Sequence, residues 1–171
     1  MALKQKDDMS KGLLLACLTA GFFGLLGCAP KKSMPTGDLV GVEYTRSGTM
    51  AGYEYEGRVQ RDSTGAFVLR AMKENYGPLF EKKLTSQDME KFLQIIKEEE
   101  MYLYKESYRP KMEVLDGWGW SFSAYFSDGS RIRSYGSNAS PKGSGLGRIY
   151  ACMNSLIQDG IPVDPSADDN Q

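Results

Sequence analysis

The chain contains no histidine and only 3 cysteines in 171 residues. Without histidine, Ser-His-Asp and Cys-His catalysis, histidine-ligated zinc and an imidazole base near neutral pH are all excluded. Charges of the two signs nearly balance, with 21 Lys and Arg against 22 Asp and Glu, and no basic block stands out. This balance argues against a nucleic acid as the partner.

The sequence also lacks a long hydrophobic run, apart from one near the amino terminus between Gly12 and Leu26. At about 15 residues, this run falls short of the roughly 20 that a membrane-spanning helix needs. Three lysines precede the run, and the small residue Gly27 follows it. A positive segment, a short apolar run and a small residue are typical of a cleavable signal peptide.

The end of this run reads Leu25-Leu26-Gly27-Cys28. An ordinary signal prefers small residues at both the −3 and −1 positions, and Leu25 does not fit the first of these. The four residues instead resemble the lipobox of bacterial lipoproteins, Leu-x-Gly/Ala-Cys. An ordinary cleaved signal and an uncleaved N-terminal anchor are the two alternatives.

The resemblance to bacterial lipoproteins implies that Cys28 carries a thioether-linked diacylglycerol and becomes the first residue of the mature chain. Each buried CH₂ of an acyl chain such as palmitate contributes about 0.8 kcal/mol, so two or three chains anchor a protein stably. The second mature residue is Ala29 and not the aspartate that marks inner-membrane retention in such lipoproteins. The resemblance therefore implies an outer-membrane lipoprotein that faces the periplasm.

We expect four segments along the chain. These are a signal peptide over residues 1–27, a flexible tether over 28–38, a single α+β domain over 39–159 and a disordered tail over 160–171. Loss of the signal removes three lysines and two aspartates, which leaves 18 basic and 20 acidic residues in 144. A chain of this length can bury a core of its own.

A lone thiol is expected after processing, because Cys17 leaves with the signal and Cys28 is alkylated. The remaining Cys152 has no partner for an internal disulfide. It lies beside the apolar stripe of the last predicted helix, so we expect a packed and unreactive thiol.

Apolar periodicity predicts the order β-β-β-α-β-β-α, an α+β fold with an antiparallel sheet of about five strands and both helices on one face. Gly65 is expected in a left-handed turn between the second and third strands. Thr85 is expected to cap the first helix, in a capping box with Asp88. The predicted strands are residues 39–46, 53–60, 67–72, 118–126 and 130–136. The first predicted helix begins at Thr85, and the last one ends at about Gln158.

The turn Ser127-Asp128-Gly129 fixes the register of the last two strands. A three-residue loop with Gly129 left-handed places Ala124 opposite Ile132, whereas a two-residue turn would place arginine on the apolar face. We therefore predict the three-residue loop. It gathers one set of polar and aromatic side chains on the face away from the helices: Tyr125, Arg131, Arg133 and Tyr135.

These four residues are the candidate partner surface, since Tyr and Arg are favoured at recognition sites. The simpler interpretation is a cation–π ladder that stiffens an exposed sheet. The apolar face of the same hairpin is interpreted as core beneath the helices, and solvent exposure of Trp118 or Trp120 would instead favour a stacking platform for carbohydrate. That core set comprises Trp118, Trp120, Phe122 and Phe126.

No motif in the chain indicates catalysis, a metal or a cofactor. Gly119 to Ser123 nearly matches G-x-S-x-G but lies within a strand, where a nucleophile elbow cannot form. Gly143 to Gly147 fits no phosphate-binding loop and reads as an irregular helix start. Glu98 to Glu100 reads as a solvated helix end, because consecutive helical residues splay around the axis.

The body also resembles small, uncharacterised lipoprotein domains of Gram-negative bacteria, through its Trp-x-Trp-x-Phe strand, Phe-Ser-Asp-Gly-Ser turn and Gly-Ser-Asn-Ala-Ser-Pro segment. That resemblance implies no known activity. We expect a non-catalytic, lipid-anchored envelope protein that acts as a protein-interaction module. The alternatives are a carbohydrate- or peptidoglycan-binding module with exposed aromatics and a histidine-free carboxylate hydrolase.

Overall fold

The computed structural model describes residues 32–48, 52–74, 77–112, 114 and 117–164. By its internal contacts the chain divides into two units, residues 1–31 and Lys32–Gln171, and the described residues all belong to the second. The predicted signal peptide, Cys28 and Ala29 lie outside the described residues. So does the end of the predicted tail, residues 165–171.

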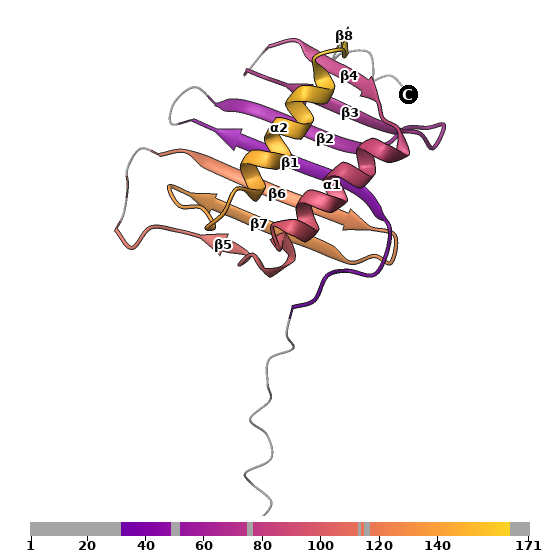
Figure 1. Cartoon of the computed structure of the whole chain (residues 1–171). Helices are drawn as coiled ribbons and strands as arrows, with labels where there is room; N and C mark the ends of the chain where they lie inside the picture. Colours follow the sequence, from indigo (N-terminus) through magenta and orange to yellow (C-terminus); the bar gives the residue numbers. More distant parts are fainter. Residues whose placement is uncertain (1–31, 49–51, 75–76, 113, 115–116, 165–171) are drawn as a thin grey trace, which may run out of the picture. The chain divides into compact units, whose positions relative to one another are not determined.

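An eight-stranded sheet, with two α-helices across one of its faces, forms the described unit (Figure 1). The strands lie in the order β5-β7-β6-β1-β2-β3-β4-β8, and every neighbouring pair is antiparallel except β5 and β7. The α+β class is thus confirmed, but the sheet is mixed and larger than the predicted five strands. Its elements are β1 Leu39–Ser47, β2 Tyr53–Arg61, β3 Phe67–Met72, β4 Leu79–Lys83, α1 Ser86–Glu98, β5 Ser107–Tyr108, β6 Gly119–Phe126, β7 Arg131–Ser137, α2 Gly145–Ile157 and β8 Ile161–Val163.

The three strands beyond the prediction are β4, β5 and β8, and all are short. A strand of two to five residues has too few alternating positions to be told from a loop. The two prolines and three aspartates of residues 161–171 predict a loose tail, which would include Ile161–Val163. Ile161–Val163 instead pairs with Leu79–Glu81 as the edge strand of the sheet, where proline is tolerated.

The predicted hairpin registers are confirmed. Val59 pairs with Leu69 across β2 and β3, and Gly65 in their turn has a φ of 84°. Ala124 pairs with Ile132 across β6 and β7, and Gly129 has a φ of 81°. In both hairpins the apolar pattern and a left-handed glycine favour the same register, so local sequence determines it.

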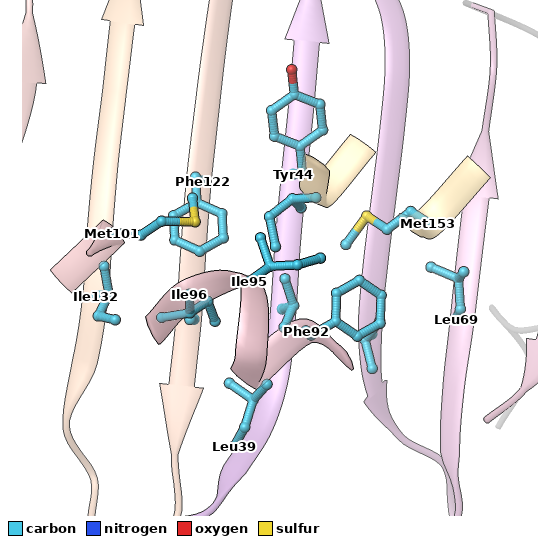
Figure 2. Packing of buried hydrophobic residues seen from close by; sticks show 14 of the residues in the cluster. Leu39, Tyr44, Leu69, Phe92, Ile95, Ile96, Met101, Phe122, Ile132 and Met153 are labelled. Atoms are coloured by element: carbon cyan, nitrogen blue, oxygen red, sulfur yellow. The ribbon is translucent and has the colours of Figure 1, made fainter. Parts of the chain in front are cut away.

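Both helices bury an apolar stripe against the sheet. Thr85 caps α1 in the predicted capping box with Asp88. Figure 2 shows two side chains of α1 in this cluster: Ile96 lies near Phe122 of β6, and Phe92 lies near Met153 of α2. Gly57 of β2 lies beneath α2, and a Cβ at this position would be 2.7 Å from the Met153 sulfur. Glycine therefore lets α2 approach β2 closely.

Trp118 departs from its predicted place in the core. Trp120, Phe122, Ala124 and Phe126 are buried as predicted, but Trp118 is 39% exposed. Trp118 comes immediately before the first residue of β6, so it lies at the end of the sheet, outside the core.

At the acidic end of α1, Glu98 and Glu100 are exposed as predicted, but Glu99 is half-buried. The Glu99 carboxylate accepts hydrogen bonds from the Ser144 amide at 3.1 Å and the Ser144 hydroxyl at 2.7 Å. The Arg148 guanidinium donates to Glu99 at 3.0 Å and to Glu98 at 2.7 Å. The end of α1 thus contacts the first turn of α2. Amide groups at a helix N-terminus have no partner within the helix, and the Glu99 carboxylate accepts a hydrogen bond from one of them, that of Ser144.

Candidate functional site

A surface hollow of about 340 Å³ lies where the start of β6, the end of β1 and the loop before α2 meet. This volume is at the lower end of the range for small-molecule sites. We call it the Trp118 hollow, after the exposed indole in its wall. The residues around it are Tyr44, Arg46, Trp118, Trp120, Ser140, Pro141, Gly143, Leu146 and Gly147.

Backbone hydrogen bonds hold Trp118 in place. Its amide donates to the Asn138 side-chain oxygen at 3.0 Å, and its carbonyl accepts from the Asn138 amide at 2.9 Å. The neighbouring Trp120 is buried, and its indole N–H donates to the Ala139 carbonyl at 2.8 Å. The two tryptophans therefore differ in role: Trp120 fixes the loop, and Trp118 presents its ring to solvent.

Polar groups accompany the indole. Figure 2 shows the Tyr44 hydroxyl pointing away from the apolar cluster, and in the described part of the chain it has no hydrogen-bond partner. Burial raises the pKa of Tyr44, so the phenol keeps its proton and can donate. The Arg46 guanidinium lies 2.9 Å from Glu54, with both side chains about half exposed. The hollow thus combines an aromatic wall with donors at its rim.

The predicted partner surface lies on the sheet face opposite the helices. The register places Tyr125 beside Arg131, and Arg133 two positions along from Arg131 on the same face as Tyr135. The Tyr125 hydroxyl donates to Glu43 at 2.9 Å, which ties this residue into the sheet. Burial, followed by that hydrogen bond, raises the pKa of Tyr125.

The other three residues of this surface are exposed, with Tyr135 at 37%. Among the described residues no hydrogen bond or ion pair joins the side chains of Arg131 or Arg133 to a neighbour. The cation–π contact in the described part lies elsewhere, with the Arg61 guanidinium 4.1 Å from the Phe67 ring centre. The interpretation of this surface as a cation–π ladder therefore has no contact to support it.

Other candidate chemistry is limited. Within the described residues no group of three or more Cys, Asp and Glu side chains could hold a metal ion. No helix in the same residues is long and apolar enough to span a membrane. Cys152 is half-buried against the core, and burial raises the pKa of its thiol. A raised pKa lowers the thiolate fraction, which is the reactive form.

No protein-family model, curated protein or solved structure matches the chain. The described residues form an α+β domain with two helices on one face of the sheet and none on the other, which we call the open face. The Trp118 hollow is the feature missed by the sequence-based prediction. The alternation of residues 118–126 grouped Trp118 with the core, and only its place before the strand could have distinguished it.

Proposed function

We propose that the chain is a lipid-anchored, non-catalytic protein of the bacterial cell envelope that binds a glycan in the Trp118 hollow. The observation that supports the glycan is the 39% exposure of Trp118 in the wall of a hollow. A buried Trp118 would have favoured the protein-interaction module instead. The lipid anchor is supported by Leu25-Leu26-Gly27-Cys28.

The chemistry of the hollow suits a sugar. The C–H faces of a pyranose ring are apolar and pack on an indole, while hydroxyl groups at the ring edge need donors and acceptors. The Tyr44 hydroxyl and Ser140 lie around the same hollow and supply them. Arg46 adds a cation: its Nε pairs with Glu54, and its terminal nitrogens are the donors offered to a ligand carboxylate. Peptidoglycan fragments carry both sugar rings and carboxylates.

Binding can be followed through the tryptophan fluorescence of the chain, which contains 2 tryptophans. Soluble disaccharide-peptide fragments of peptidoglycan should change the emission of the wild type in a saturable way. Trp118→Ala should abolish binding to the fragments in calorimetry and in sedimentation with insoluble peptidoglycan. Tyr135→Ala is the matched control, because Tyr135 is exposed to a similar extent on the opposite face. Equal binding by Trp118→Ala and wild type would refute the glycan site.

The anchor is tested separately in cells. Cys28→Ser should release the chain from the membrane fraction, whereas Cys152→Ser should not. Intact mass of the native protein should show loss of residues 1–27 and added acyl mass on Cys28. Ala29→Asp should move the protein from the outer to the inner membrane in a density gradient. Retention of residues 1–27 or a bare Cys28 thiol would refute the lipoprotein assignment.

The second candidate is a protein partner on the open sheet face, favoured by the exposure of Arg131, Arg133 and Tyr135. A photo-crosslinking residue at position 135 should capture one envelope protein in living cells. The same residue at position 61, at the far end of β2, is the control. Capture of the same abundant proteins from both positions would count against this candidate.

A further inference from the structure

The segment that leads from the tether into β1 is fastened at both ends. The Lys32 ammonium donates to the Tyr104 carbonyl at 2.5 Å, and the Gly37 amide donates to Asp128 at 3.0 Å. We call the residues from Lys32 to Gly37 the strap. Between its two fastened ends the strap runs beside β7 and borders a second hollow of about 320 Å³.

The edge of β7 is open along this hollow. In the hairpin, the Ser130 carbonyl accepts from Phe126 of β6, whereas the Tyr135 amide donates away from β6, to Glu106. Backbone groups alternate in direction along a strand, so Arg131 and Arg133 share the outward direction of Tyr135. In the described part of the chain no backbone partner meets these two residues. Two N–H donors are therefore free at the edge.

The hollow is also positively charged. Three cationic residues line it, Lys32, Arg131 and Arg133, against the single carboxylate of Glu106. The two arginine side chains are exposed and have no ion-pair partner among the described residues. Guanidinium groups and backbone N–H groups are the donors that proteins use for phosphate oxygens. An oxyanion is the ligand that this combination suits.

The tether brings the hollow close to a membrane if Cys28 is lipidated. Lys32 is four residues after Cys28, and four extended residues span at most about 14 Å. The Lys32 end of the strap lies beside η1 (Met101–Leu103), so an anchor on Cys28 would keep this edge within reach of the headgroups. A tethered site meets headgroups at a high effective concentration, so even a weak site is occupied.

We propose that the strap hollow binds the phosphate of an anionic phospholipid headgroup and thereby orients the domain with the β7 edge against the membrane. This inference rests on the proposed lipid anchor. The ligand chemistry is a phosphate ester that accepts hydrogen bonds from the Arg131 and Arg133 amides and guanidinium groups. Free phosphate in solution offers the same chemistry, and vesicles with and without added inorganic phosphate distinguish it from a lipid headgroup.

The test uses native, lipidated protein in vesicles of phosphatidylcholine alone or with a third of phosphatidylglycerol. Hydrogen exchange of the peptide that carries residues 131–133 is the readout. Phosphatidylglycerol should slow this exchange at least about threefold, the change that two-thirds occupancy produces. Arg131→Gln/Arg133→Gln should lose the effect. Arg109→Gln/Lys111→Gln also removes two exposed positive charges and should keep it.

Each other outcome contradicts a defined part of the proposal. Equal protection by inorganic phosphate with phosphatidylcholine vesicles would assign the hollow to a soluble anion. If residues 131–133 were protected from exchange only after addition of envelope extract, the ligand of the β7 edge would be a protein. No difference between the two lipids, with protein bound to both, would refute the headgroup site while leaving the anchor intact. Failure of the protein to float with phosphatidylcholine vesicles would instead refute the anchor.

Discussion

The Gly37 amide lies 3.0 Å from the Asp128 carboxylate, so the β6–β7 turn holds the segment that enters β1. The same carboxylate accepts from the Ser130 hydroxyl at 2.5 Å, the Ser130 amide at 2.9 Å and the Thr36 hydroxyl at 3.2 Å. These hydrogen bonds, those from Ser130 first, lower the pKa of Asp128 to about 2. One turn residue thus orders both its own hairpin and the strap.

The lowered pKa of Asp128 predicts how stability depends on pH. The ionised form is favoured in the folded state, so its contribution is complete above the unfolded pKa of about 3.9 and is lost as pH falls through about 2. Asp128→Asn should therefore lower the melting temperature at pH 5, and the difference from wild type should shrink between pH 4 and pH 2. A difference that stays constant over this range would contradict the assignment.

Gly129 carries a conformational requirement, since its φ of 81° is unfavourable for residues with a Cβ. Nothing lies within 4 Å of a Cβ built at this position, so any cost of substitution comes from the backbone alone. Gly129→Val should destabilise the fold by about 1 kcal/mol or more in urea unfolding.

Gly147 is the matched control for that substitution. It lies within α2, and a Cβ there also meets nothing within 4 Å. Gly147→Ala should stabilise the fold by about 0.5–1 kcal/mol, because alanine loses less backbone entropy in a helix. An unchanged midpoint for Gly129→Val would reject the three-residue turn.

The parts of the fold that could be predicted from sequence are those in which local signals agree. The turns at Gly65 and Gly129 fix registers that the apolar pattern supports, and Thr85 with Asp88 marks the start of α1. Such features depend on residues within a few positions of one another. Local chemistry alone is then sufficient to define them.

The missed features depend on residues far apart in the chain. Ile161–Val163 is a strand only because β4 presents a free edge, and Ser107–Tyr108 only because β7 does. The same limit applies to the candidate site. Exposure of Trp118 depends on its pairing with Asn138, and on where the loop before α2 lies. Such contacts join residues far apart in the chain, so the periodicity of the sequence does not predict them.

Glu99 predicts a coupling between the two helices. Hydrogen bonds from Ser144, and then from Arg148, lower the pKa of Glu99, so its ionised form stabilises the fold above the unfolded pKa of about 4.3. Glu99→Gln should lower the melting temperature at pH 7 and lose much of that effect near pH 3. Glu100→Gln, at an exposed neighbouring carboxylate, should change the melting temperature little at either pH. Equal effects of the two variants would show that Glu99 does not cap α2.

Tyr55 predicts a substitution that stabilises the protein. Its side chain is 2% exposed beneath Tyr150 of α2, and its hydroxyl has no hydrogen-bond partner in the described structure. A buried hydroxyl that loses its water without gaining a partner destabilises the folded state. Burial accordingly raises the pKa of Tyr55.

Tyr55→Phe removes that hydroxyl and keeps the ring packing, so urea unfolding should show a gain of about 1 kcal/mol. Tyr125→Phe is the opposite control, because the Tyr125 hydroxyl donates to Glu43. Tyr125→Phe should lower the free energy of unfolding by about 0.5–1.5 kcal/mol, the usual net contribution of one hydrogen bond. Destabilisation by Tyr55→Phe would show that its hydroxyl has a partner, such as an internal water, and would remove the proposed penalty.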